Sequence, residues 1–203
     1  MPEPGVVASV VMPLLRHTDP LPHGPQRIVV AGVTGVGKST LCGRIAQLWN
    51  LPHVGMDELH WGPDWTPRPE FTAEATALAE SDRWVTEWQY WSRGFKHGLG
   101  DRADTCIWLD FPRWRAWPRL FRRTVSRSVS GREVFEGCVE PPLWRVFTDE
   151  DHILRWESRT HNTWRERMQT IPGEFPHLTI VELRSPAEVR RWLAGPAARA
   201  VTT

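Results

Sequence analysis

A glycine-rich segment constrains this chain more than any other feature. Residues 32–40 read G-V-T-G-V-G-K-S-T, which satisfies the pattern G-x-x-x-x-G-K-[ST]. The segment follows the apolar, β-branched run Arg27–Ala31 and precedes Lys38–Asn50, whose apolar residues recur with helical spacing. In such a strand–loop–helix connection, glycines let backbone N–H groups converge on an anion at the positive end of the helix dipole. The alternative is an ordinary glycine turn before a helix.

The spacing predicts that this loop holds the phosphates of a nucleoside triphosphate, ATP or GTP. The Lys38 ammonium would bridge the β- and γ-phosphates, and the Ser39 hydroxyl would bind Mg²⁺. Only two of the 25 cationic residues are lysines, so Lys38 stands out in an arginine-rich chain. The predicted nucleotide contacts are Gly32, Thr34, Gly35, Val36, Gly37, Lys38, Ser39 and Thr40.

Strands and helices alternate along the chain, which predicts an α/β fold with an open, mostly parallel sheet of five strands flanked by helices. The predicted strands are Arg27–Ala31, Leu51–Met56, Trp84–Glu87, Thr105–Leu109 and Leu178–Leu183. The predicted helices are Lys38–Asn50, Pro69–Asp82, Ser92–Leu99, Trp114–Ser128, Thr148–Gln169 and Pro186–Ala194.

Length and composition indicate one domain. The chain has 203 residues, of which 40% are hydrophobic, enough for one closed core. We expect a Pro-rich extension over 1–25, the domain over 26–195 and a tail over 196–203. No apolar run approaches the ~18 residues of a membrane span, and no signal peptide is recognisable. Three cysteines without C-x-x-C spacing fit neither a disulfide framework nor a zinc site, which favours a reducing cytoplasm.

Three carboxylates close predicted strands. Asp57, Glu87 and Asp110 would lie on the rim that also carries the phosphate loop, since the carboxyl ends of parallel strands share one edge. Carboxylates there can hold Mg²⁺, directly or through water, or accept a proton from a hydroxyl group. Each residue could equally be a helix cap or a turn residue.

An arginine-rich segment follows the fourth predicted strand. Seven arginines and no acidic residue lie between Phe111 and Arg132, and their mutual repulsion favours an anionic partner. Together with a later helix, this segment predicts a lid over about 113–165 that closes over a triphosphate. A solvated helix face and a nucleic-acid contact are the alternatives, although the net charge of +1 gives no general attraction to nucleic acid. The interleaved tryptophans are predicted to pack rather than to stack on bases: Trp114, Trp117, Trp144, Trp156 and Trp164.

With these motifs in place, the chain resembles the adenylate-kinase-like P-loop kinases, in particular a small bacterial group labelled DNA topology modulation proteins. The resemblance runs from about Arg27 to Leu193. Besides the phosphate loop, it is carried by the segments M-D-E-L-H-W, W-T-P-R-P, W-V-x-x-x-x-Y, R-A-D-T-C-I-W-L-D-F-P-R-W and D-E-D-H-I-L-R-W. It implies a nucleotide-dependent phosphotransferase with a small-molecule acceptor and no membrane partner.

The resemblance also implies roles for individual residues. Arg119 and Arg123 match the side on which adenylate kinases open their lid, and Arg155 and Arg159 match its closing side. Glu87 keeps the carboxylate that holds a Mg²⁺ water, with Ser39 as the direct ligand. Arg184 stands where a side chain stacks on adenine.

The predicted acceptor side departs from the family pattern. Asp57 would orient or deprotonate the acceptor, or hold a Mg²⁺ water, but His60 and Trp91 stand where two phosphate-binding arginines are expected. Trp88 replaces a glycine and would crowd or stack on the acceptor, and Arg68, Arg93 or Lys96 would substitute for the missing arginines. The predicted acceptor contacts are Asp57, His60, Trp61, Arg68, Trp88, Tyr90 and Arg93.

Three functions remain open at this point. The leading one is a Mg²⁺–ATP-dependent phosphotransferase acting on a nucleotide or a hydroxyl compound, and D-x-L-H is also similar to gluconate kinases. A nucleotide-dependent regulatory or nucleic-acid-binding protein is the second. A relative that binds nucleotide without transferring phosphate is the third.

Overall fold

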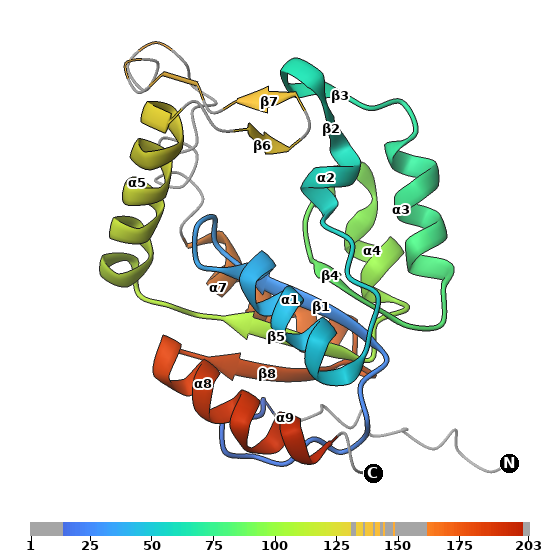
Figure 1. Cartoon of the computed structure of the whole chain (residues 1–203). Coiled ribbons are helices and arrows are strands. Elements are labelled where there is room, and N and C mark those ends of the chain that lie inside the picture. The colour runs from blue at the N-terminus through green and yellow to red at the C-terminus, as the bar shows by residue number, and fades with distance from the viewer. Residues whose placement is uncertain are drawn as a thin grey trace, which may run out of the picture.

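The computed structural model describes residues 14–130, 133–135, 137–139, 141–142, 144, 148 and 162–200. Its centre is a parallel sheet with the strand order β4-β1-β5-β8 (Figure 1). The strands are β1 (Arg27–Gly32), β4 (Trp84–Glu87), β5 (Thr105–Leu109) and β8 (Thr179–Leu183). Nearly all of their side chains are buried, as expected for a parallel sheet covered on both faces. The predicted α/β fold is therefore confirmed.

The sheet has four strands rather than the five predicted. The segment Leu51–Met56 forms one isolated parallel bridge, His53 with Val85, before the short helix α2 (Met56–His60) begins. Pro52 has no N–H to donate to a ladder, and it contributes only its carbonyl, to Val85 N at 2.9 Å. Asp57 consequently lies in the first turn of a helix and not at the end of a strand.

The opposite edge of the sheet is also extended by one bridge. Leu15 pairs with Val181 of β8, through hydrogen bonds from Leu15 N to Ile180 O at 2.8 Å and from Glu182 N to Leu15 O at 2.9 Å. The Arg16 guanidinium adds a side-chain hydrogen bond to Glu182. The described end of the predicted extension is thus docked on the sheet.

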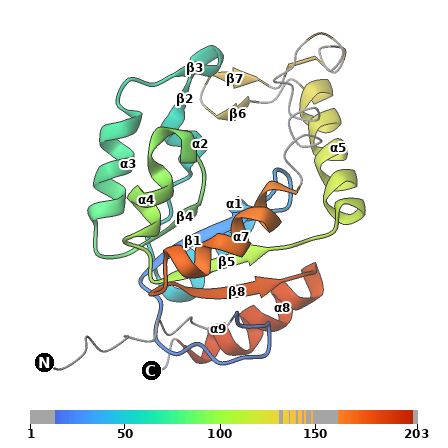
Figure 2. The same ribbon diagram turned by 180° about the vertical axis from the view of Figure 1, so that it is seen from behind.

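Helices cover both faces of the sheet. Helix α1 lies over one face and α7 over the other, as the two opposite views agree (Figures 1 and 2). Helix α5 stands apart from the sheet, beyond the carboxyl end of β5. The longer helices are α1 (Lys38–Trp49), α3 (Phe71–Glu80), α5 (Arg113–Ser130), α7 (Thr163–Glu174) and α8 (Pro186–Ala194), with α4 (Phe95–Gly100) and α9 (Pro196–Arg199) shorter. The predicted start of the Thr148–Gln169 helix lies largely outside the described residues, which include its part from Thr163 onward.

Two short hairpins complete the architecture. One consists of β2 (Trp61–Gly62) and β3 (Thr66–Pro67), joined by the 3-10 turn η1 (Pro63–Trp65). The other consists of β6 (Glu133–Phe135) and β7 (Cys138–Val139). Asp64 N donates to Gly137 O at 3.0 Å, and Trp65 Nε1 donates to Val139 O at 2.7 Å, so the two hairpins contact each other (Figure 1). A second 3-10 turn, η2 (Trp91–Arg93), follows β4.

The tryptophans divide between core and surface. Trp88 is completely buried, with its ring centroid 5.1 Å from that of Trp91 and 6.1 Å from that of Trp164. Trp114 is 68% exposed and Trp144 61% exposed, so these two lie at the surface and not in the core. Trp156 lies outside the described residues. Within the described residues, no helix is both long enough and apolar enough to cross a bilayer.

Candidate active site

The glycine loop has backbone angles that residues with a side chain rarely adopt. Gly32, Gly35 and Gly37 have φ values of 144°, 75° and 111°, in the region that favours glycine. A Cβ on Gly32 would lie 2.9 Å from the Leu109 carbonyl oxygen of β5, and one on Gly35 would lie 2.7 Å from Leu120 Cβ of α5. The loop therefore passes closer to β5 and α5 than any residue with a side chain could.

Lys38 begins α1 and points back across this loop. Its ammonium donates hydrogen bonds to Gly32 O at 3.0 Å and Val33 O at 3.1 Å, and only 8% of the residue is exposed. Burial lowers the pKa of this ammonium, while the charges of Asp57 and Glu87 raise it. Lys38 is thus a buried cation that is bonded to two main-chain carbonyls and stabilised by the charges of two carboxylates.

The two carboxylates come from different elements. Glu87, the last residue of β4, is 3% exposed and accepts a hydrogen bond from Met56 N at 3.2 Å. Asp57, in α2, is half-buried and accepts a hydrogen bond through Oδ1 from the Tyr90 hydroxyl at 2.7 Å. Burial raises the pKa of Asp57, and the Tyr90 hydrogen bond and the Lys38 charge lower it. The register that pairs Val30 with Glu87 places Glu87 beside the beginning of the loop.

Helix α5 brings two of the predicted lid arginines to the loop. The Arg119 Nη2 atom lies 3.6 Å from the position that a Cβ on Gly37 would occupy. The Arg123 charge acts on both Lys38 and Asp57, lowering the pKa of each. Both arginines are exposed, as are the Ser39 and Thr40 side chains in the first turn of α1. Arg155 and Arg159 lie outside the described residues.

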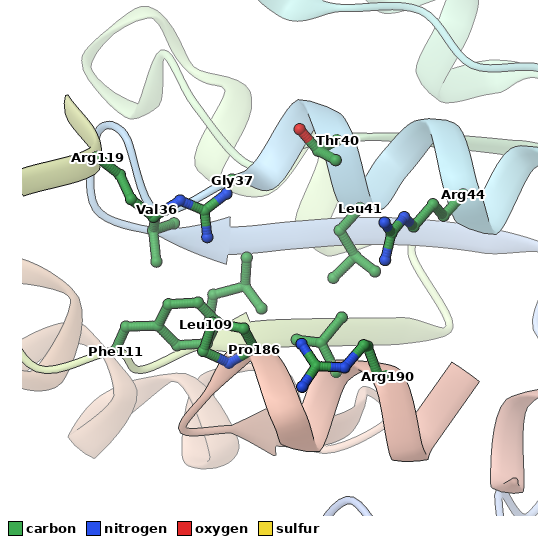
Figure 3. Close-up of a pocket in the computed structure, with 11 residues that line it drawn as sticks. Val36, Gly37, Thr40, Leu41, Arg44, Leu109, Phe111, Arg119, Pro186 and Arg190 are labelled. Carbon is green, nitrogen blue, oxygen red and sulfur yellow. The ribbon is translucent and has the colours of Figure 1, made fainter. Parts of the chain in front are cut away.

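A pocket of about 290 Å³ opens beside the loop, between α1, the end of β5, α5 and the start of α8 (Figure 3). Arg119 and Pro186 lie on two sides of it, and Thr40 and Arg44 come from successive turns of α1. Its walls are formed by Val36, Gly37, Thr40, Leu41, Arg44, Leu109, Phe111, Arg119, Pro186, Val189 and Arg190.

Arg184, predicted to stack on a base, is not among the residues that line this pocket. Its guanidinium donates to Glu182 Oε1 at 2.9 Å, and its main-chain N–H donates to Glu188 Oε2 at 2.8 Å. Pro186 lines the pocket two residues later. The resemblance places the purine at the segment Leu183–Pro186, which includes Pro186, whereas Val189 and Arg190 on α8 were not predicted.

On the predicted acceptor side, His60 and Tyr90 lie near Asp57. The His60 ring is 4.5 Å from the Tyr90 ring and 4.4 Å from the Trp61 ring, measured between centroids. His60 is 2% exposed, and its Nδ1 has no hydrogen-bond partner among the residues that the structure describes. The exposed Arg93 acts on His60 electrostatically and, with burial, lowers its pKa.

Three other predicted residues are engaged elsewhere. Arg68 donates to Glu74 Oε1 at 2.8 Å and to Leu59 O at 3.3 Å, which ties the β3–α3 connection to α2. Trp88 has no exposed surface, so its indole cannot crowd or stack on an acceptor in this conformation, and the expectation is corrected. Asp110 accepts a hydrogen bond from Arg165 Nε at 2.8 Å, so its carboxylate is paired with a cation.

Lys96, the chain's second lysine, also lies away from Asp57. It pairs with Glu174 at 2.5 Å and lies 5.5 Å from the centre of the Trp91 ring. It therefore does not replace the expected acceptor arginines in this conformation.

Cys42, His53 and Glu87 also approach one another, with one potential ligand atom of each within 4.8 Å of the others. Metal binding requires the thiolate form of cysteine. Burial and the Glu87 charge raise the pKa of the Cys42 thiol well above its ordinary value. We assign no metal to this cluster.

No protein-family model and no curated protein sequence matches the chain. Among solved structures, a gluconokinase from Sinorhizobium meliloti 1021 matches with a TM-score of 0.50 and 21% identity, over 89% of this chain and 96% of that one. A shikimate kinase from Acinetobacter baumannii in complex with shikimate matches with a TM-score of 0.49 and 16% identity, over 87% and 89%. A sugar kinase from Janibacter sp. HTCC2649 matches with a TM-score of 0.43 and 19% identity, over 92% and 98%.

At these identities the likeness concerns the fold. The parallel sheet, the glycine loop after its strand β1 and the flanking helices together form an architecture of the same kind as the gluconokinase structure. The chain therefore has an α/β fold like that of the gluconokinase structure.

Proposed function

We propose that this protein is a Mg²⁺–ATP-dependent kinase that phosphorylates a hydroxyl group of a small molecule. One observation carries the proposal: the buried Lys38 ammonium donates to two carbonyls of the glycine loop, and the charges of Asp57 and Arg123 act on it. A hydroxyl acceptor requires a base, and a phosphate acceptor requires arginines. Asp57 supplies the base, whereas Arg68 is tied to Glu74.

The residues at the loop fit a magnesium nucleotide. Three glycines of the loop have positive φ and place no side chain of their own against an anion, and the exposed Ser39 hydroxyl lies in the first turn of α1. Ser39 and Glu87 would hold the metal ion, Glu87 through a water molecule, and the pocket between Arg119 and Pro186 would hold the base. When bound, Mg²⁺–ATP supplies the phosphoryl group and part of the neutralising charge.

The remaining chemistry belongs to side chains of this chain. Lys38 would exchange its two carbonyl partners for phosphate oxygens and stabilise the charge on the transferred group. Arg119 and Arg123 would stabilise the same charge from the side of α5, and Arg155 and Arg159 would add to them. Asp57 would accept the proton of the acceptor hydroxyl. His60, Trp61 and Arg93 would contact the rest of the acceptor. Closure of α5 over the loop would exclude water.

A coupled assay of ADP release tests the proposal. Nucleoside monophosphates, nucleosides, gluconate and shikimate are supplied in turn with Mg²⁺–ATP. We expect release to depend on a hydroxyl acceptor, to fall about 10²–10³-fold in Lys38→Ala and about 10²–10⁴-fold in Asp57→Asn. Lys96→Ala, which alters the only other lysine, is the matched control and should keep full activity. ADP release that is independent of every acceptor contradicts the proposal, as does calorimetry that detects no ATP binding.

A second function is favoured by the surface of α5. The Trp117 and Phe121 rings stack at 5.4 Å with an interplanar angle of 10°, and the Arg115 guanidinium lies 4.5 Å from the Trp114 ring centre. Exposed aromatic rings beside arginines can bind single-stranded nucleic acid. Binding of a labelled oligonucleotide that persists at ~200 mM salt would favour this function, whereas lid arginines predict no binding there.

A further inference from the structure

Tyr90 has a backbone conformation that a residue with a side chain rarely adopts. Its φ and ψ are 55° and 39°, in the left-handed region, at the start of the 3-10 turn η2. Residues held in this region depend on their surroundings to stay there, and they concentrate at functional sites. Tyr90 is also the only tyrosine in the chain. A glycine or asparagine would satisfy the turn at lower cost, so the side chain itself requires an explanation.

The contacts of this side chain supply that explanation. The ring packs against two others, with centroid distances of 4.5 Å to His60 and 4.9 Å to Phe71. This packing fixes the ring, so that its hydroxyl ends 2.7 Å from Asp57 Oδ1. A phenol is protonated at neutral pH, and Tyr90 is therefore the donor in this hydrogen bond.

The hydrogen bond occupies one side of the Asp57 carboxylate. Among the described residues, no hydrogen bond to Oδ2 occurs. The charges facing Asp57 come from three further elements: Lys38 of α1, Glu87 of β4 and Arg123 of α5. These charges favour or oppose ionisation but do not determine which oxygen turns toward a substrate, whereas a short, directed hydrogen bond does.

We propose that Tyr90 is the positioning residue of the catalytic carboxylate: it holds Asp57 Oδ1 so that Oδ2 faces the hydroxyl group of the acceptor. The inference rests on the proposed kinase function and assigns Tyr90 to Asp57, where the sequence pattern had suggested contact with the acceptor. The strained backbone is the cost of this orientation. A base that is held in one orientation loses no freedom when the acceptor binds.

The matched pair of variants is Tyr90→Phe and Thr86→Val. Tyr90→Phe removes only the hydroxyl and keeps the ring contacts. Thr86→Val removes a nearby hydroxyl group that makes no hydrogen bond to Asp57. This hydroxyl donates a 2.7 Å hydrogen bond to Val54 O, in the segment that precedes α2. With an acceptor that supports ADP release, Tyr90→Phe should lower kcat about tenfold, with less than about a twofold change in the KM for ATP. Thr86→Val should leave kcat within about twofold.

A spectroscopic arm needs neither acceptor nor activity. Labelling with [¹³Cζ]tyrosine gives a single resonance, because there is one tyrosine. At a fixed pH of about 7.5, Asp57→Ala should shift this resonance, and Thr86→Val should leave it in place. An unchanged resonance in Asp57→Ala overturns the assignment, as does a kcat for Tyr90→Phe equal to that of wild type or of Thr86→Val. Absence of ADP release with every acceptor would instead refute the kinase function. The tyrosine resonance would still test the hydrogen bond between Tyr90 and Asp57.

Discussion

Gly35 offers the sharpest test of how the phosphate loop depends on helix α5. Its φ of 75° disfavours any residue with a side chain, and a Cβ there would lie 2.7 Å from Leu120 Cβ and 3.0 Å from Leu120 Cδ1. Leu120 is completely buried, and its Cβ is attached to the backbone of α5, so it cannot move away without the helix. Gly35→Ala therefore strains the loop and separates it from α5 at the same time.

The cost of this substitution can be worked out from the two effects. The left-handed conformation costs an alanine about 1–2 kcal/mol, and overpacking a tight contact costs about 1–3 kcal/mol. Their sum is about 2–5 kcal/mol of unfolding free energy. Gly43 provides the matched control, because it lies inside α1 and a Cβ there meets nothing within 4 Å. Gly43→Ala should stabilise the protein by about 0.5–1 kcal/mol.

Urea unfolding of both variants measures these differences, and calorimetry with Mg²⁺–ATP measures the loop. We expect Gly35→Ala to unfold at lower urea concentration and to bind ATP less tightly, and Gly43→Ala to unfold at higher concentration with unchanged affinity. If Gly35→Ala matches the wild type in stability and in ATP affinity, the close approach of the loop to α5 is wrong.

Three further predictions concern single side chains. Burial raises the pKa of Asp57, so the folded state binds the carboxyl proton more tightly than the unfolded state does. Protonation of Asp57 therefore stabilises the folded state at low pH, and this stabilisation is lost as pH rises above the ordinary Asp range. Asp57→Asn should therefore raise Tm at pH ~7.5 and lose this advantage near pH ~3, as calorimetric melting at both values would show. Trp88→Ala should cost about 3–5 kcal/mol of stability in urea, because the indole lies wholly in the core; an exposed, acceptor-facing indole would cost far less. Cys42, Cys106 and Cys138 are all buried, so a thiol reagent should label them only after unfolding, and rapid labelling of the native protein would contradict their burial.

Local patterns predicted the parts of this site that depend on neighbours in sequence. The loop conformation follows from its own glycines, and Lys38 and Ser39 follow at fixed spacing on α1. The strand predicted over Leu51–Met56 is wrong: the segment forms one bridge to β4, and Pro52 has no N–H to donate to a ladder. The β-propensity of a segment does not indicate whether it can form the hydrogen bonds of a neighbouring strand.

Residues brought together from distant segments could not be predicted in this way. Pro186 and Arg190 share a pocket with Thr40 because α8 packs beside α1, which no local pattern encodes. Trp88 matched an acceptor position in the family pattern, yet a cluster that includes Trp91 and Trp164 draws its ring into the core. The hydrogen bond between Tyr90 and Asp57 joins residues 33 positions apart, and only the fold shows it.

The docking of Leu15 on β8 bears on whether this edge of the sheet can pair with another chain. A β-strand at the edge of a sheet offers unpaired amides and carbonyls to any extended chain. Leu15 covers Ile180 O and Glu182 N, and Arg16 neutralises a carboxylate on the same strand. A chain shortened to begin after Arg16 would leave the hydrogen-bonding groups at the edge of β8 unpaired. We expect this shortened chain to self-associate through β8 while its phosphate loop stays intact.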